Sequence, residues 1–132
     1  MLKSFDHIAA PMEHVELMLQ RYTALGCEGL DQGHIQAIVF GNNKINFHMP
    51  SLWDGGKFTL RGHTALPGSA DICFVWDGSQ ETLLTALDAA KAEIELGPVA
   101  RTGGMNRGST EGTSIYTRDP DNNLIELSLI HI

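Results

Sequence analysis

Residues 113–130, TSIYTRDPDNNLIELSLI, predict two strands joined by a tight turn. In LIELSLI, apolar residues alternate with Glu126 and Ser128, which is typical of a strand with one face against a core. The DPDNN segment at 119–123 favours a turn, because Asp and Asn bond their own backbone and Pro fixes φ. We therefore expect a strand on each side of this turn.

A similar turn and strand occur earlier in the chain, which indicates an internal repeat. NNKINF at 42–47 matches NNLIEL at 122–127, and DHIA at 6–9 matches ADIC at 70–73. The matched turns lie 80 residues apart and the matched opening strands lie 64 apart. The second repeat therefore has about 16 extra residues, which we place in the glycine-rich segment 103–112, since inserted loops often carry function.

The elements expected between these landmarks give the same order twice. Pro11 suits the first turn of a helix, whose apolar residues recur at helical spacing up to Leu25. Ser79 is the expected N-cap of a second helix, which continues through Ile94 and is closed by Gly97-Pro98. The other strands are expected at 5–10, 36–40, 44–49, 71–76 and near 98–102. The chain thus reads β-α-β-β-(β) twice, as one domain, 1–132, with modules at 1–61 and 62–132.

Polar side chains fall on the strand faces opposite those predicted to pack on the helices, because side chains alternate along a strand. They are His7, Asn46, His48, Asp71 and Glu126. Imidazole and carboxylate groups together are what a divalent cation needs. The pattern indicates a shared metal site between the two halves. The alternative is a wetted sheet face whose polar residues bond one another.

Composition excludes several classes of function. The 132 residues carry 9 Lys and Arg against 16 Asp and Glu, a net charge of −7, so no nucleic-acid or anionic-membrane surface is expected. No apolar run approaches a membrane span and no signal peptide is evident, so we expect a cytoplasmic protein. Cys27 and Cys73 form no CxxC pair and are expected as reduced thiols. GxSxG, P-loop and GxGxxG motifs are absent from the sequence.

Three segments resemble the vicinal oxygen chelate superfamily, which includes glyoxalase I, fosfomycin-resistance proteins, extradiol dioxygenases and bleomycin-binding proteins. They are FDHI at 5–8, GSADICF at 68–74 and YTRDPDNNLIEL at 116–127. KINFH at 44–48 and LGPV at 96–99 look most like the glyoxalase-domain-containing, lactoylglutathione lyase-like subgroup. The resemblance implies an α+β fold of two βαβββ modules, which form a curved mixed sheet with a central cleft.

The resemblance also implies a divalent metal in that cleft, with His7, Asp71 and Glu126 as ligands. Asp71 stands where the family more often has His, which favours Mn, Mg, Fe, Co or Ni over a histidine-rich Zn site. The fourth position is Asn46 by repeat register. His48, two residues on and on the same face, is the better candidate for a fourth ligand or a general base.

A second, local resemblance is to fosfomycin-resistance thiol transferases, through NR at 106–107 and EGTSIY at 111–116. It implies that Glu111 and Ser114 help bind a monovalent cation and that Tyr116 contacts a substrate phosphonate. Tyr116 is therefore a second candidate catalytic residue. Glutathione or another thiol becomes a candidate co-substrate.

These observations lead to three hypotheses. The leading one is a metal-dependent, glyoxalase-like lyase or isomerase that acts on a small oxygen-bearing substrate. The others are a fosfomycin-type thiol transferase and a non-catalytic protein that binds a drug or metabolite. A homodimer is expected, since the superfamily often exchanges modules between subunits. Among other residues, Trp53 and Phe58 either line the pocket or cover the core, Cys73 is expected to be buried, and His131 lies in the tail.

Overall fold

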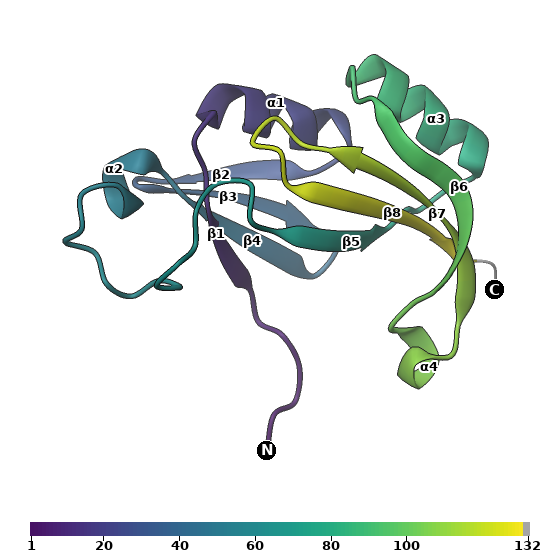
Figure 1. Cartoon of the computed structure of the whole chain (residues 1–132), viewed down its shortest axis with the longest axis horizontal. Helices are drawn as coiled ribbons and strands as arrows, with labels where there is room; N and C mark the ends of the chain where they lie inside the picture. The colour runs from purple at the N-terminus through teal and green to yellow at the C-terminus, as the bar shows by residue number, and fades with distance from the viewer. Residues whose placement is uncertain (131–132) are drawn as a thin grey trace.

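A computed structural model of the chain describes residues 1–130, and His131 lies outside the described residues. The fold is α+β, with two four-stranded mixed sheets (Figure 1). The first sheet has the strand order β1 (Ile8–Pro11), β4 (Asn43–His48), β3 (Ile35–Phe40), β2 (Glu28–Gln32). The second has the order β5 (Asp71–Val75), β8 (Leu124–Ile130), β7 (Glu111–Arg118), β6 (Ile94–Thr102). The predicted fold class is confirmed.

The strand register confirms the internal repeat. In the first sheet, β1 runs parallel to β4 with Ile8 opposite Ile45, and in the second, β5 runs parallel to β8 with Ile72 opposite Ile125. In the two sequence matches, Ile8 is equivalent to Ile72 and Ile45 is equivalent to Ile125. The observed strand pairs therefore agree with both matches. The connections differ, because β2 and β3 are joined by a tight turn whereas β6 and β7 are joined through the short helix α4 (Met105–Gly108).

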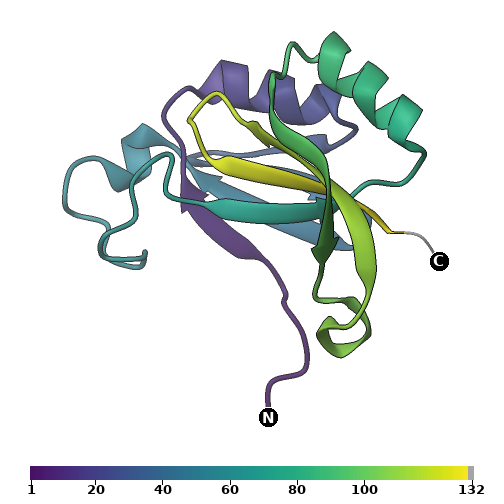
Figure 2. The same cartoon turned by 45° about the vertical axis from the view of Figure 1, so that its right-hand side comes forward.

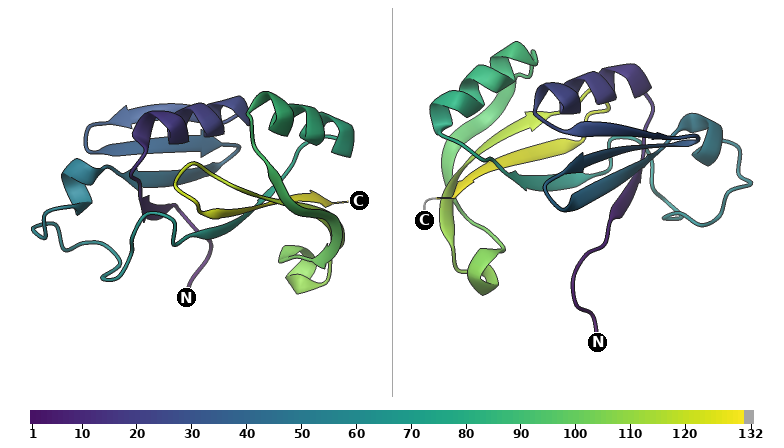
Figure 3. Two further views of the ribbon diagram at one scale, coloured as in Figure 1. Left: turned by 45° about the horizontal axis from the view of Figure 1, so that its top comes forward. Right: turned by 180° about the vertical axis from the view of Figure 1, so that it is seen from behind.

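Two helices cover the same side of the two sheets, as Figures 1 and 3 show. They are α1 (Val15–Ala24) and α3 (Gln80–Ala89), and a short third helix, α2 (Pro50–Trp53), begins the loop that leads to β5. Ser79 caps α3 as predicted, since its side chain accepts a hydrogen bond from the backbone N–H of Thr82. The sheet faces turned away from α1 and α3 are called the open face below.

The hydrophobic core lies between the helices and the sheets and joins both halves of the chain. Met18 and Tyr22 of α1 and Leu83 and Leu87 of α3 are buried. The rings of Tyr22 and Phe74 lie 6.1 Å apart, so an aromatic pair connects α1 to the second sheet. The apolar positions Ile125, Leu127 and Leu129 of β8 are buried as the alternation predicts.

Two expectations about element boundaries are wrong, and one strand is missing from the prediction. Pro11 lies in β1 opposite His48, where the lack of an N–H is tolerated because β1 is an edge strand, and α1 begins only at Val15. The second helix ends at Ala89, because Lys91 takes a positive φ of 56°, so Ile94 opens β6 instead of continuing the helix. The strand β2 is absent from the predicted elements, and all five of its residues are exposed.

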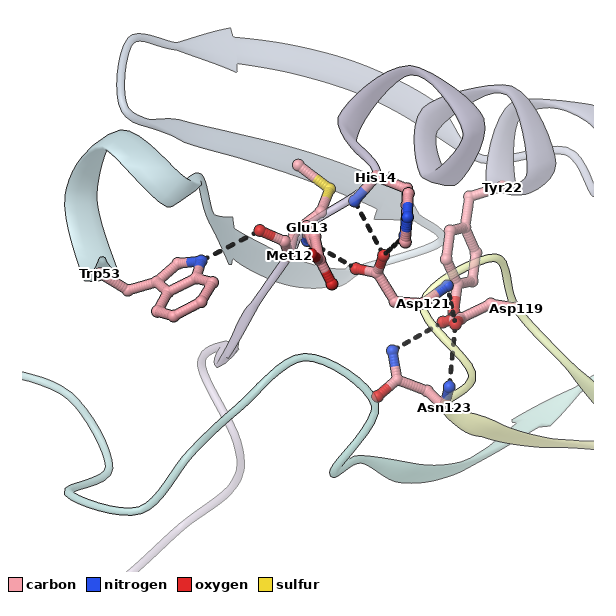
Figure 4. A network of polar contacts seen from close by, with 8 residues as sticks. All are labelled: Met12, Glu13, His14, Tyr22, Trp53, Asp119, Asp121 and Asn123. Carbon is pink, nitrogen blue, oxygen red and sulfur yellow. Dashed lines mark hydrogen bonds and ion pairs between the residues drawn. The ribbon is translucent and has the colours of Figure 1, made fainter. Parts of the chain in front are cut away.

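The DPDNN turn connects the second half of the chain to the start of α1 (Figure 4). The buried Asp121 carboxylate accepts hydrogen bonds from the backbone N–H groups of Glu13 and His14, each at 2.8 Å. The side chain of His14, which is the N-cap residue of α1, makes no cap bond of its own. Asp121 therefore caps α1 from the other half of the molecule and satisfies donors that a helix start leaves open.

The buried Asp119 side chain stabilises the same turn through hydrogen bonds. Its carboxylate accepts a 2.7 Å hydrogen bond from the Tyr22 hydroxyl and bonds from the backbone and side-chain N–H groups of Asn123. Asn123 in turn accepts from the backbone N–H of Ala70, just before β5. The turn thus contacts α1, β5 and its own strands. Asn122 takes a φ of 75° there, which Asn tolerates better than most residues.

Candidate functional site

The open face of the second sheet carries a carboxylate held by a hydroxyl. Glu126 of β8 is half-buried, and the fully buried Ser114 of β7 donates a 2.6 Å hydrogen bond to its Oε2 atom. Ile125 and Leu127, on either side of Glu126, face the core. The alternation of β8 therefore places Glu126 on the open face, as the sequence predicts.

Asp71 and Cys73 belong to β5, the strand next to β8, which carries Glu126. Cys73 is opposite Glu126 in the ladder, and Asp71 is opposite Leu124. Partial burial, together with the nearby Glu126 and Asp71 carboxylates, raises the pKa of the Cys73 thiol to about 12. The expectation that Cys73 is buried is wrong, because β5 is an edge strand and covers the residue only in part.

Tyr116 also belongs to this face, since it lies directly opposite Glu126 in the β7–β8 ladder. Its hydroxyl oxygen accepts a 3.1 Å hydrogen bond from Nε of Arg101 on β6, and the guanidinium carbon lies 5.6 Å from the centroid of the Tyr116 ring. Arg101 is absent from the sequence prediction. The register of β6 shifts twice between Ile94 and Val99, so alternation along the sequence gives no signal for its position.

His7 lies directly before β1, in the exposed N-terminal segment that leaves the sheets on the side opposite the helices (Figures 1 and 2). Its Nδ1 atom is 2.7 Å from the Asp6 carboxylate. His7 and Cys73 line one groove of about 390 Å³, which runs between the two sheets and is also lined by Lys44 and Phe74. The groove brings one predicted ligand from the first half close to the second sheet.

His48 lies at the end of β4, under the loop that connects the two halves. It is 7% exposed, and its ring packs edge-on against Phe58 at 5.4 Å between centroids. Burial and the nearby Arg61 guanidinium hold the pKa of His48 below its usual value. Because Phe58 packs against the ring of His48, it covers that side chain. Trp53, the other aromatic residue of this region, donates a 3.0 Å hydrogen bond to the backbone oxygen of Met12.

The structure brings some of the predicted site residues together and keeps others apart. Glu126, Ser114 and Tyr116 are neighbours, and Asp71 is near them across Cys73. Glu111 is exposed at the start of β7. Asn46 has a buried Oδ1 atom with no hydrogen-bond partner among residues 1–130. Within that same range, no three His, Cys, Asp or Glu side chains meet closely enough to hold a metal ion.

Comparison with known proteins identifies the family. The chain is 36% identical over 128 residues to a glyoxalase domain-containing protein, RDO1, of Mycosarcoma maydis, covering 96% of this chain and 68% of that protein. The chain belongs to the vicinal oxygen chelate superfamily. It is also 33% identical to the virulence protein STM3117 of Salmonella typhimurium, covering 93% of this chain and 81% of that protein. No family model matches the chain.

Solved structures of the vicinal oxygen chelate fold agree with this assignment. The crystal structure of STM3117 superposes with a TM-score of 0.83 at 32% identity, covering 98% of each chain. A fosfomycin-resistance protein, FosX, of Listeria monocytogenes, in complex with Mn(II) and 1S,2S-dihydroxypropylphosphonic acid, has a TM-score of 0.64 at 17% identity, covering 97% of this chain and 90% of that chain. Within residues 1–130, no helix has the length and apolar character needed to cross a membrane.

Proposed function

We propose that this chain is a metal-dependent enzyme of the vicinal oxygen chelate superfamily, a lyase or isomerase acting on a small substrate with two adjacent oxygens. The observation that carries the proposal is the Glu126 carboxylate, fixed on the open face by the 2.6 Å bond from Ser114. A fixed carboxylate is oriented before a cation arrives, as metal ligands in proteins generally are.

The donors present fit a divalent metal in their chemistry. His7 offers Nε2, since its Nδ1 atom contacts Asp6, and Glu126 offers Oε1, since its Oε2 atom accepts from Ser114. Asp71 adds a second carboxylate near Glu126, and such a hard donor set favours Mn²⁺, Fe²⁺, Co²⁺, Ni²⁺ or Mg²⁺ over Zn²⁺. Since three donors do not meet within the described part of one chain, we propose that a second copy completes the set in a homodimer.

A metal bound there would act as a Lewis acid toward oxygens of the substrate. Ser114 keeps Glu126 in position, and the Tyr116 hydroxyl stands opposite Glu126 as a donor to substrate oxygen. His48 is the proposed base, because the lowered pKa keeps its imidazole neutral and able to accept a proton near pH 7. Phe58 packs on that ring, so access to His48 requires movement of Phe58.

Fosfomycin-type thiol transfer is a second candidate, which the position of Tyr116 on the open face supports. It would require a thiol such as glutathione as co-substrate. The two candidates differ in the proposed role of Ser114. In the leading proposal the Ser114 hydroxyl orients Glu126, to which it donates a hydrogen bond. In thiol transfer of the fosfomycin type, Ser114 would instead help to bind a monovalent cation. Stimulation of thiol transfer by K⁺, lost in Glu111→Gln, would favour the second candidate.

Metal analysis tests the leading proposal. We expect about one divalent ion per chain after loading with Mn²⁺, and less than a tenth of that in His7→Ala and in Glu126→Gln. Glu16→Gln, an exposed change on α1, is the matched control and should bind metal as the wild type does. Unchanged metal content in both site variants would refute the proposal.

A mixing experiment tests whether the site forms between copies. His7→Ala and Glu126→Gln protomers are unfolded together, refolded and loaded with metal. If His7 of one copy joins Glu126 of the other, half of the randomly paired dimers regain one site, which restores about a quarter of the wild-type metal content. No recovery would place both ligands in the same chain.

A further inference from the structure

A groove of about 500 Å³ opens between the two halves of the chain, on the helix side of the sheets. Four aromatic side chains line it: Tyr22 of α1, Phe40 of β3, Phe74 of β5 and Trp76 just after β5. Because Phe74 follows Cys73 of the open face along β5, it faces the other side of the sheet. We call this hollow the aromatic groove, and it lies across the sheets from the proposed metal ligands.

The rings of the aromatic groove are held in place but keep exposed surface. Phe40 and Phe74 meet edge-on with their centroids 5.2 Å apart, and the indole N–H of Trp76 donates a 3.1 Å hydrogen bond to the hydroxyl of Thr82. Phe40, Phe74 and Trp76 are each half-buried, and all three pack against the core. Small-molecule sites typically enclose roughly 300–1,000 Å³. The aromatic groove therefore has the size of such a site and is formed before any ligand arrives.

The lining of the aromatic groove carries a single charge, and that charge is negative. Among residues 1–130, those that line it include no Lys, Arg or His and one acid, the exposed Asp77. Cys27 also lines the groove, and burial raises the pKa of its thiol to about 11, so the thiol is uncharged near pH 7. The whole chain has a net charge of −7. An anion would be repelled here, whereas a cation is attracted by Asp77 and by the faces of the aromatic rings.

We propose that the aromatic groove binds a small organic cation with an aromatic body, such as a protonated or quaternary aromatic amine. The ring of the ligand packs against Phe40 and Phe74, and its ammonium group lies near Trp76 and the carboxylate of Asp77. The inference goes beyond the proposed function, because the groove and the proposed metal ligands lie on opposite sides of the sheets. A second copy of this chain seated in the groove is the competing occupant.

Small probes test the class of ligand without knowledge of the natural one. Benzyltrimethylammonium, the neutral benzyl alcohol, the anionic phenylacetate and the ringless tetramethylammonium are each titrated into the ¹⁵N-labelled protein. Amide shifts of residues 25–27, 40–43 and 74–77 and the indole N–H shift of Trp76 are followed by NMR. We expect saturable binding of benzyltrimethylammonium, weaker binding of benzyl alcohol and of tetramethylammonium, and none of phenylacetate. Residues 111–118 of the second sheet should keep their shifts throughout.

Variants assign the binding to the aromatic groove. Asp77→Asn should weaken binding of benzyltrimethylammonium about threefold, because it removes an exposed charge. Phe40→Leu should weaken it about fivefold, because it removes an aromatic face. Asp54→Asn and Phe58→Leu make the same changes at residues outside the lining and should bind as the wild type does. Asp77→Asn alters an exposed side chain, so it gives a result even if Phe40→Leu fails to fold.

Several results would overturn the inference. They are no saturable binding of benzyltrimethylammonium, equal or tighter binding of phenylacetate or benzyl alcohol, and equal weakening in the control variants. Groove amides that shift with protein concentration, in a protein that does not bind the probe, would assign the groove to a second copy instead. None of these measurements depends on Mn²⁺ loading, so a failure here is distinct from a failure of the metal proposal.

Discussion

The backbone N–H and the Nδ1 atom of His14 both lie 2.8 Å from Oδ1 of Asp121, although the two residues are 107 positions apart. His14 is the N-cap residue of α1 in the first half of the chain, and Asp121 belongs to the turn between β7 and β8. One carboxylate therefore caps a helix and fixes the position of that helix relative to the second sheet. The hydrogen-bond network around it is the main polar connection drawn in Figure 4.

We expect Asp121→Ala to lower the free energy of unfolding by about 2–3 kcal/mol, because it leaves the donors at the start of α1 unpaired. Urea denaturation monitored by circular dichroism measures the change. Asp54→Ala is the control, since Asp54 is exposed. Equal stability of the Asp121 variant and the control would contradict the capping role.

The Tyr22–Asp119 bond predicts a pH dependence of stability at alkaline pH. Burial and the Asp119 carboxylate raise the pKa of Tyr22 far above its usual value of 10.0. The stability that this group contributes is present below pH 10 and is lost as the pH rises, because the unfolded chain releases the phenolic proton first. We expect the unfolding free energy to fall more steeply above pH 10 in the wild type than in Tyr22→Phe, and equal slopes would refute this.

His48 should titrate below its usual pKa of 6.5, because burial and Arg61 disfavour its protonated form. Phe58→Ala should raise that pKa by exposing the ring, and Arg61→Gln should raise it by removing a positive charge. NMR titration of the imidazole measures both shifts. The stability that neutral His48 contributes is present above pH 6.5 and is lost as the pH falls, because the unfolded chain binds the proton first. An unchanged pKa of His48 in both Phe58→Ala and Arg61→Gln would show that neither neighbour acts on His48.

Ser114→Ala should reduce metal affinity about tenfold, because it removes the hydroxyl that orients Glu126. Ser128→Ala is a matched control, since Ser128 lies opposite Ser114 on the same face and makes no side-chain hydrogen bond among residues 1–130. Isothermal titration calorimetry with Mn²⁺ gives both affinities. Equal losses in the two variants would argue against a specific role of Ser114.

Gly97→Ala should destabilise the fold, because a Cβ atom at Gly97 would lie 2.6 Å from the backbone oxygen of Ser114. Gly97 also has a φ of 117°, which disfavours any other residue. Gly29→Ala is the control, because a Cβ atom there meets nothing within 4 Å. Thermal unfolding compares the two variants, and a melting temperature for Gly97→Ala as high as that of the control would contradict the crowding.

Sequence patterns predict the features that depend on neighbours along the chain. The alternation in β8 separates Glu126 from the buried Ile125 and Leu127, and the repeat places Ile8 and Ile72 in equivalent pairs. These features follow from local periodicity, which survives in any fold that buries one face of each strand.

Features that depend on distant contacts escape such prediction. The start of α1 is set by Asp121, 107 residues away, and β2 lacks alternation because all its residues are exposed. The position of Arg101 follows from shifts in the register of β6, and the burial of His48 follows from the path of the loop that carries Phe58. None of these relationships leaves a periodic signal in the sequence.

In the described part of the chain, no strand of one sheet is hydrogen-bonded to a strand of the other. The separation between His7 and Glu126 is therefore governed by side chains at the joint between the halves, Tyr22, Asp119 and Asp121 among them. Substitutions at this joint can therefore shift one open face relative to the other while every residue on those faces is preserved.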